Sequence, residues 1–168
     1  MDARQYERLT APLRRKPLLC SLLRTANRLT TAAVYAVYVL YNLLLLVQRD
    51  RQLLPTLLVP AVFFLLISVC RDRINAPRPY EVLDIDPIIR KDTHGHSFPS
   101  RHVFSVFLIA TTIGTQVLWL GAALAVIGVF ICIIRVVGGV HFPRDVFAGL
   151  LLGVACGLLG CSVWNALI

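Results

Sequence analysis

Residues 103–134 read VFSVFLIATTIGTQVLWLGAALAVIGVFICII, a run without one charged side chain. A single helix of about 32 residues would be ~48 Å long at ~1.5 Å per residue, well beyond the ~30 Å hydrocarbon core of a bilayer. The run therefore predicts a hairpin of two membrane spans that turns near Gln116–Gly121. Trp119 within this turn suits the interface between lipid and water.

Three further apolar runs are long enough to be spans. Leu29–Val47 and Leu53–Cys70 are uncharged and are joined by the polar turn Gln48–Gln52. Val146–Ile168 is the last run, and its glycines at positions 149, 153 and 157 have the spacing of close helix packing. The hydrophobic fraction of 57% and mean hydropathy of +0.73 exclude an ordinary soluble domain. We predict a single domain, residues 1–168, that folds as an all-α polytopic membrane bundle of about five transmembrane helices.

The N-terminal segment, residues 1–28, is basic. This segment and the polar stretch between Arg71 and Arg101 together contain most of the formal net charge of +8. Basic and apolar residues alternate in Tyr6–Arg28, which predicts an amphipathic interfacial helix; a basic anchoring tail is the alternative. The segment lacks the apolar core and cleavage pattern of a signal peptide. Uncharged runs between the basic zones exclude a typical nucleic-acid partner and favour the bilayer and phosphate groups.

Three polar clusters interrupt the apolar sequence, each at the end of a predicted span. They comprise Arg71 with Arg78-Pro79, then Pro99-Ser100-Arg101-His102, then Arg135 with His141 and Asp145. Residues 71–102 are rich in charge, Pro and His without a helical period, which predicts an ordered active-site loop outside the hydrocarbon. If residues 103–134 form a hairpin, all three clusters lie on one membrane face.

The third cluster predicts a histidine at the start of a helix. Pro143 suits the first helical turn because its missing N–H would have no partner there. Asp145 lies one turn after His141, where its carboxylate can accept the imidazole proton, fix the tautomer and leave the other nitrogen free to attack. A His and an Asp that merely cap a helix are the alternative.

The second cluster also predicts functional side chains at the start of a helix. Ser97 can cap this helix and Pro99 can open it, so that the N–H groups near Ser100 and Arg101 bind an anion. His102 is placed to donate a proton to a leaving oxygen, as general acid catalysis requires. A single histidine at a membrane interface would not by itself predict a general acid. The neighbouring polar clusters favour this role for His102.

Arg71, Arg78 and Arg135 supply three guanidinium groups from separate segments. Their planar forks match phosphate oxygens and offset the charge of a trigonal bipyramidal transition state. The remaining cations of the loop are assigned to snorkelling at span ends: Arg73, Arg90 and Lys91. His94 and His96 form an H-x-H pair without a third ligand at suitable spacing, so neither a metal nor another cofactor is predicted.

In order and internal spacing, the clusters resemble the motifs of the type 2 phosphatidic acid phosphatase superfamily. The family pattern is Lys, six residues, Arg-Pro; then Pro-Ser-Gly-His; then Ser-Arg, five residues, His, three residues, Asp. Here the chain reads R71-DRINAP-R78-P79, P99-S100-R101-H102 and I134-R135-VVGGV-H141-FPR-D145. The departures are Arg71 for Lys, Arg101 for Gly and Ile134 for Ser, and the last removes a hydroxyl near the phosphate.

The resemblance implies a membrane lipid phosphatase that needs no metal. His141 would attack phosphorus to form a phosphohistidine, Asp145 would orient it, and His102 would protonate the leaving lipid oxygen and then activate water. The phosphate would be held by Arg71, Arg78, Ser100, Arg101 and Arg135. Family members usually have six spans, so the basic N-terminal segment would replace one helix.

The candidate lipid substrates are undecaprenyl pyrophosphate or another polyprenyl pyrophosphate, phosphatidic acid and phosphatidylglycerol phosphate. Analogy with small bacterial members favours the polyprenyl carrier, a bacterial plasma membrane and a site on the outer face. The positive-inside rule, applied to the basic N-terminus, points to the cytoplasmic face instead. A lipid phosphotransferase with the same site and a non-enzymatic membrane scaffold are the alternatives, and the sequence carries no signal of oligomeric state.

Overall fold

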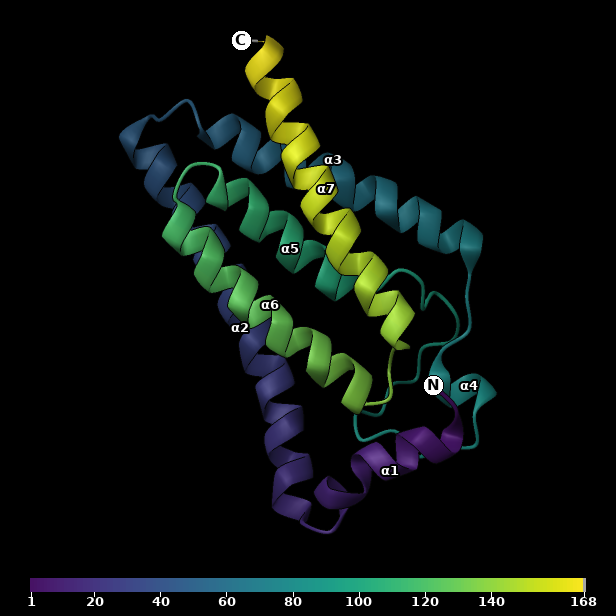
Figure 1. Ribbon diagram of the computed structural model, residues 1–168. Coiled ribbons are helices and arrows are strands. Elements are labelled where there is room, and N and C mark those ends of the chain that lie inside the picture. Colours follow the sequence, from purple (N-terminus) through teal and green to yellow (C-terminus); the bar gives the residue numbers. More distant parts are fainter. Residues whose placement is uncertain (168) are drawn as a thin grey trace.

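Helices dominate residues 1–167, the part of the chain that the computed structural model describes (Figure 1). They are α1 (Ala3–Arg14), α2 (Pro17–Gln48), α3 (Leu53–Ile74), α4 (Pro79–Val82), α5 (Arg101–Gly114), α6 (Leu118–Val137) and α7 (Pro143–Leu167). Four of these helices, α2, α3, α6 and α7, are long and apolar enough to cross a membrane. The predicted all-α class is confirmed, and the predicted last residue of the final span, Ile168, lies outside the described residues.

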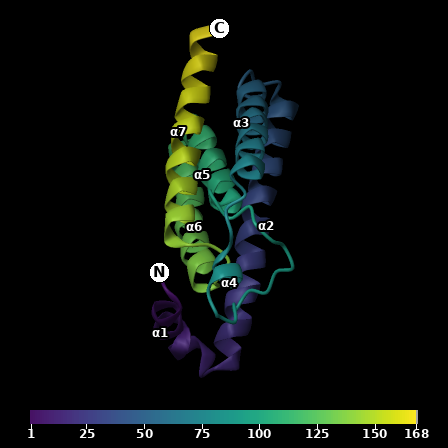
Figure 2. The same cartoon turned by 90° about the vertical axis from the view of Figure 1, so that its right-hand side faces the viewer.

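Of the five predicted spans, four are long and apolar enough to cross a membrane, whereas α5 is only 14 residues long. At ~1.5 Å per residue it measures ~21 Å, short of the ~30 Å hydrocarbon core. Helix α5 lies in the middle of the bundle and packs against α3, α6 and α7 (Figure 2). Most of its residues are buried, so protein rather than lipid surrounds its apolar side chains.

The predicted glycine stripe is confirmed as the contact between α7 and α5. A Cβ at Gly149 would lie 2.7 Å from the carbonyl oxygen of Ser100, and a Cβ at Gly153 would lie 2.6 Å from that of Phe104. Such distances are shorter than real Cβ contacts, so only glycine lets the two backbones approach this closely. The close approach fixes the start of α5 against the first turns of α7.

The basic N-terminal segment does not form the single predicted helix Tyr6–Arg28. It is divided between α1 and the first turns of α2, with Lys16 in an extended conformation between them. Pro17 causes the break, because proline disfavours a helical conformation of the preceding residue and itself suits the first position of a helix. Helix α1 lies across the end of the bundle, beside α4 and the loop that follows it (Figure 1).

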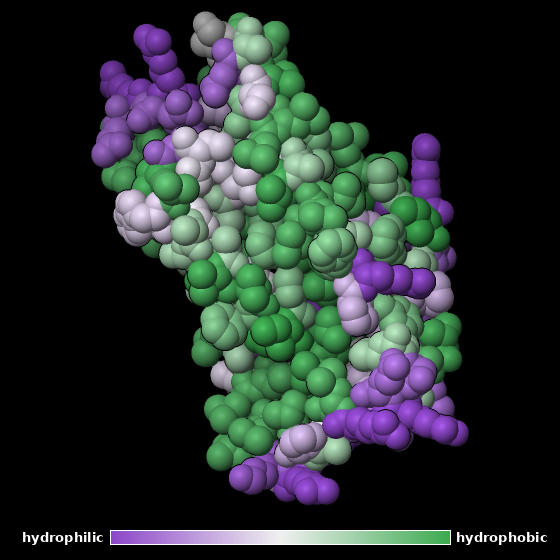
Figure 3. Space-filling view, in the orientation of Figure 1, coloured by the Kyte–Doolittle hydropathy of each residue, from purple (hydrophilic) through white to green (hydrophobic). Residues whose placement is uncertain are grey.

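The hairpin prediction places the three polar clusters at the same end of the bundle, and the structure agrees. Helix α5 ends at Gly114 and α6 begins at Leu118, close to the predicted turn Gln116–Gly121. Consequently the ends of α3 and α6 meet the starts of α5 and α7 at one end (Figure 1). Hydrophilic side chains gather at the two ends of the molecule, with a mostly apolar belt between them (Figure 3).

Candidate active site

Helix ends, rather than the loop, carry most of the predicted site residues. Arg71 and Arg135 lie in the last turns of α3 and α6, so the predicted loop 71–102 is shortened to residues 75–100 and contains the one-turn helix α4. His102 lies in the first turn of α5. Asp145 lies in the first turn of α7, which begins at Pro143 as predicted. Such helix termini bring side chains and free backbone groups to one place.

A buried hydroxyl joins the predicted His141–Asp145 pair. The two side chains are close, but Nδ1 of His141 lies 3.8 Å from Oδ2 of Asp145, too far for the direct hydrogen bond that was predicted. Ser97 lies between them: its Oγ donates to Oδ2 of Asp145 at 2.6 Å and lies 3.3 Å from Nδ1 of His141. All three residues are buried.

The hydrogen bonds among Ser97, His141 and Asp145, the triad, determine the tautomer of the imidazole. A serine hydroxyl has one proton, which Ser97 directs at Asp145, so its oxygen can only accept from His141. The proton of the neutral imidazole therefore resides on Nδ1, and Nε2 keeps a free lone pair. Burial lowers the pKa of His141 to about 4, against the opposing effect of Asp145, so the ring is neutral at pH 7.

Asp145 also ties the starts of two helices together. Its Oδ2 accepts the N–H of Phe142 at 3.0 Å, and its backbone carbonyl accepts the N–H of Ser100 at 2.8 Å. Ser97 is itself held by its N–H, which donates to the carbonyl of Ala76 at 2.8 Å. These bonds keep the triad in register with the N-terminus of α5.

The second cluster differs in detail from its prediction. Helix α5 begins at Arg101 with Ser100 at its N-cap, two positions later than the predicted start at Pro99. Ser97 does not cap this helix, because its hydroxyl is bound to Asp145. Ser100 is fully buried and its Oγ lacks a partner among the described residues, whereas His102 is half-buried.

The arginine cluster consists of four side chains: Arg71, Arg78, Arg101 and Arg135. Arg71 donates to the carbonyls of Pro99 and His96, and Arg78 donates to those of Gly95 at 3.0 Å and Val140 at 3.4 Å. Both side chains are buried and brace the loop, but each guanidinium keeps further N–H groups. Arg101 is exposed, and its guanidinium lies 5.6 Å from the centre of the Phe64 ring.

Arg135 is the most deeply buried member of the cluster, with 1% of its surface exposed. Its Nε and Nη1 atoms find no acceptor, and no carboxylate pairs with it, within residues 1–167. Its carbonyl accepts the N–H of His141 at 3.3 Å, which folds the intervening turn back onto the end of α6. A buried guanidinium with unused donors beside a neutral imidazole is suited to an oxyanion.

Each of the two loop histidines lies near a carboxylate. His94 Nδ1 lies 3.2 Å from Glu81 Oε1, and His96 Nδ1 lies 3.2 Å from Asp72 Oδ1. Glu81 also accepts the N–H of Gly95 at 3.0 Å, so this contact orders the loop beside Arg78. Lys91 departs from its prediction as well: it is half-buried and within electrostatic range of the arginine cluster and His102.

Comparison with known proteins assigns the family. The model of the PAP2 superfamily matches residues 52–167, which include all three polar clusters. The chain belongs to the PAP2 superfamily. This is the family that the motif spacing resembles, so the resemblance is confirmed, and the match reaches beyond residues 71–145 to α3 and α7.

Three curated proteins are similar over part of the chain. Lipid phosphate phosphatase epsilon 2, chloroplastic, of Arabidopsis thaliana is 31% identical over 146 residues, covering 85% of this chain and 49% of that protein. The undecaprenyl-diphosphatase of Sulfolobus acidocaldarius is 30% identical over 123 residues, covering 72% and 60%. The putative undecaprenyl-diphosphatase YbjG of Escherichia coli K12 is 39% identical over 72 residues, covering 42% and 36%. The chain thus spans less than two thirds of each relative's length.

Two solved structures share the fold over nearly the whole chain. LpxE of Aquifex aeolicus is 27% identical with a TM-score of 0.74, covering 96% of this chain and 94% of that one. A transmembrane PAP2 type phosphatidylglycerolphosphate phosphatase from Bacillus subtilis is 23% identical with a TM-score of 0.76, covering 98% and 87%. The four candidate spans and the high mean hydropathy of the PAP2 chain are those of an integral membrane protein.

Proposed function

We propose that this PAP2 protein is a membrane lipid phosphatase that transfers a phosphoryl group from a lipid to His141 and then to water. One observation carries the proposal: a buried neutral imidazole with its Nε2 lone pair free lies within electrostatic range of the buried guanidinium of Arg135, whose Nε and Nη1 atoms find no acceptor among the described residues. Burial of an unpaired charge is costly, and a multi-oxygen anion offsets that cost. Phosphate supplies such an anion and an electrophilic phosphorus.

In the first step, the Nε2 lone pair of His141 forms a bond to phosphorus while the bond between phosphorus and the lipid oxygen breaks. In the free site, burial and the neighbouring cations lower the pKa of His102, so we propose that it takes up a proton together with the anionic substrate and donates this proton to the departing oxygen. The imidazole becomes positively charged, and Asp145 stabilises this charge through the Ser97 hydroxyl. The arginine cluster and Ser100 bind the equatorial oxygens of the transition state.

In the second step, water attacks the phosphohistidine. His102, now neutral, accepts a proton from this water as the N–P bond breaks, and inorganic phosphate leaves. Every donor and acceptor in this cycle is a side chain of the chain itself, so we propose a metal-independent reaction.

For the substrate, we propose a polyprenyl diphosphate such as undecaprenyl pyrophosphate. Two similar proteins are named undecaprenyl-diphosphatases, which supports this choice over phosphatidic acid and phosphatidylglycerol phosphate. By the same analogy we place the site on the outer face of a bacterial plasma membrane.

The test is release of inorganic phosphate by purified protein in detergent with EDTA, on each of the three lipids. His141→Ala is compared with His94→Ala, a matched control whose side chain is 86% exposed in the loop. We expect release by the parent and by His94→Ala, and a loss of at least about 10³-fold in His141→Ala, as for other covalent nucleophiles. Release that survives in His141→Ala would reject the mechanism. Transfer of the phosphoryl group to an added alcohol without release to water would favour the phosphotransferase.

A further inference from the structure

The segment that follows α4 is fixed to the rest of the protein at two successive residues. The N–H of Ile88 donates to the hydroxyl of Tyr6 at 3.3 Å, and the N–H of Ile89 donates to the carbonyl of Gly138 at 3.1 Å. Both isoleucines are buried. Since Gly138 ends α6 three residues before His141, the segment is aligned with the catalytic turn.

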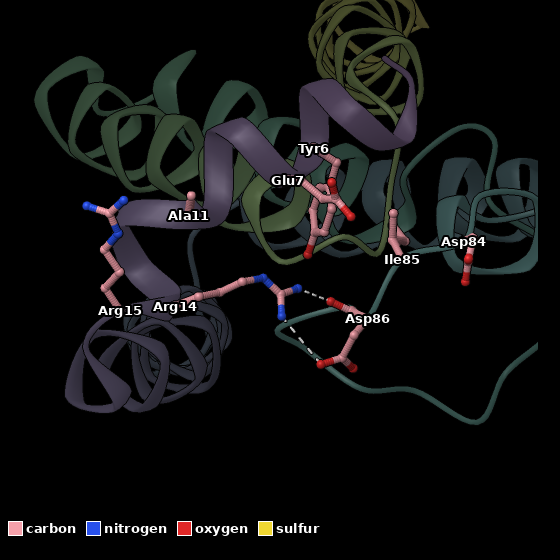
Figure 4. A pocket seen from close by; sticks show the side chains of 8 residues that line it. All are labelled: Tyr6, Glu7, Ala11, Arg14, Arg15, Asp84, Ile85 and Asp86. Carbon is pink, nitrogen blue, oxygen red and sulfur yellow. Dashed lines mark hydrogen bonds and ion pairs between the residues drawn. The ribbon is translucent and has the colours of Figure 1, made fainter.

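Helix α1 supports the same segment from outside the bundle. Arg14 pairs with the Asp86 carboxylate at 3.4 Å and also donates to its backbone carbonyl (Figure 4). The two elements line an open pocket of about 550 Å³, and none of the predicted site residues lines it. Tyr6 is fully buried, and a Cβ at Gly139 would lie 2.6 Å from its hydroxyl, so this tyrosine contacts the catalytic turn as well.

These contacts place two neighbouring cations in different surroundings. Arg90 is 83% exposed and lies 3.5 Å from Asp86 on the solvent side. Lys91 is half-buried and follows by two residues the bond between Ile89 and Gly138 that aligns the segment with the catalytic turn, and the arginine cluster and His102 lie within electrostatic range of it. Neither a carboxylate nor a hydrogen-bond acceptor for its ammonium is found in the described part of the chain. Burial and the four guanidinium groups lower the pKa of Lys91 to about 8.

The site therefore contains more positive charge than one phosphate group requires. In the proposed reaction, Arg71, Arg78 and Arg135 bind the phosphoryl group that His141 attacks. Lys91 is a further cation that interacts with His102, the residue that faces the leaving oxygen in the proposed reaction. In a lipid monophosphate this oxygen belongs to an alcohol, whereas in a lipid diphosphate it belongs to a second phosphate.

We propose that Lys91 binds the second, lipid-linked phosphate of a diphosphate substrate and thereby makes the site selective for lipid diphosphates. This inference rests on the proposed reaction at His141. The bond that breaks joins the terminal phosphorus to the bridging oxygen, and its electron pair moves onto the leaving lipid monophosphate. The Lys91 ammonium stabilises the charge that develops there, and His102 supplies the proton. A lipid monophosphate offers Lys91 no such group.

The test compares a prenyl diphosphate with the prenyl monophosphate of the same chain, in detergent. Removal of a charge-assisted hydrogen bond at Lys91→Met is expected to lower kcat/KM about ten- to a hundredfold on the diphosphate, with less than about a threefold change on the monophosphate. Lys91→Arg keeps the charge and is expected to retain most of the selectivity. Arg90→Met is the control, because the neighbouring Arg90 faces solvent.

Binding measurements separate this proposal from the proposed function. A prenyl methylenediphosphonate and a prenyl phosphonate cannot be hydrolysed, and their affinities are measured by calorimetry on the same variants. Weaker binding of only the diphosphonate by Lys91→Met supports the second-phosphate site even if the parent proves unable to release phosphate. Equal losses on both ligands, or none, would overturn the role of Lys91 and leave the reaction at His141 intact. If Lys91→Met weakens the binding of both ligands equally, and does so only in vesicles of anionic lipid, Lys91 would be assigned to the membrane surface instead.

Discussion

Replacement of Ser97 by alanine is expected to slow the chemical step without weakening substrate binding. The Ser97 hydroxyl connects His141 to Asp145, because the His141 Nδ1 and Asp145 Oδ2 atoms are 3.8 Å apart, too far for a direct hydrogen bond. Its loss removes a hydrogen bond to a charged group, which contributes about 1.5–3 kcal/mol, and leaves the buried Nδ1–H of His141 without a close acceptor. If this loss falls on the imidazolium-like transition state, kcat decreases about ten- to a hundredfold.

The loop is expected to keep its position in this variant, because the backbone N–H of Ser97 still donates to Ala76. KM should therefore stay within about threefold of the parent value, since the groups proposed to bind phosphate are unchanged. The assay is steady-state phosphate release in detergent, with Ser105→Ala as the control; Ser105 is also buried, but its hydroxyl donates to a carbonyl of its own helix. An unchanged kcat in Ser97→Ala, or a rise in KM alone, would refute the role of the Ser97 hydroxyl in stabilising the charge on His141.

Two further predictions concern pH and packing. For the diphosphate substrate, kcat/KM should fall as pH rises through about 8. The pKa of Lys91 is lowered to about this value, so its positive charge is present below this pH and lost above it. Lys91→Arg should abolish the fall, and pH profiles of the parent and this variant check the prediction. Gly153→Val should force α7 away from the Phe104 carbonyl of α5 and destabilise the protein by about 1–3 kcal/mol. The measurement is a lower Tm in detergent. The control is Ala155→Val, which lies on the exposed side of α7 and should change Tm little.

Local signals in the sequence predict much of the scaffold. Pro143 marks the start of α7, the glycine spacing marks its contact with α5, and the uncharged run from Val103 marks a hairpin. The short central span was not predicted, because run length reports the absence of charge and does not distinguish a helix in lipid from one surrounded by protein. Helix α5 is of the second kind.

The contacts of the loop could not be predicted in the same way. Ser97 and Lys91 lie in a segment without periodicity, and their positions depend on bonds to residues far away in sequence, such as Asp145 and Gly138. Ser97 was interpreted as a helix cap and Lys91 as a snorkelling side chain, since each fits the local pattern. Only the three-dimensional arrangement connects the hydroxyl to His141 and the ammonium to the arginine cluster.

The central claim is that His141 carries the phosphoryl group, and trapping of the intermediate tests it most directly. His102→Ala is mixed with a polyprenyl diphosphate labelled at the terminal phosphate, quenched in alkali, and mapped by mass spectrometry. A lipid phosphate can leave without a proton, whereas water needs the base, so the intermediate should accumulate in this variant. The account predicts label on His141 that is absent when His141 is also replaced. Label on another residue, or phosphate release without a labelled protein, would contradict it.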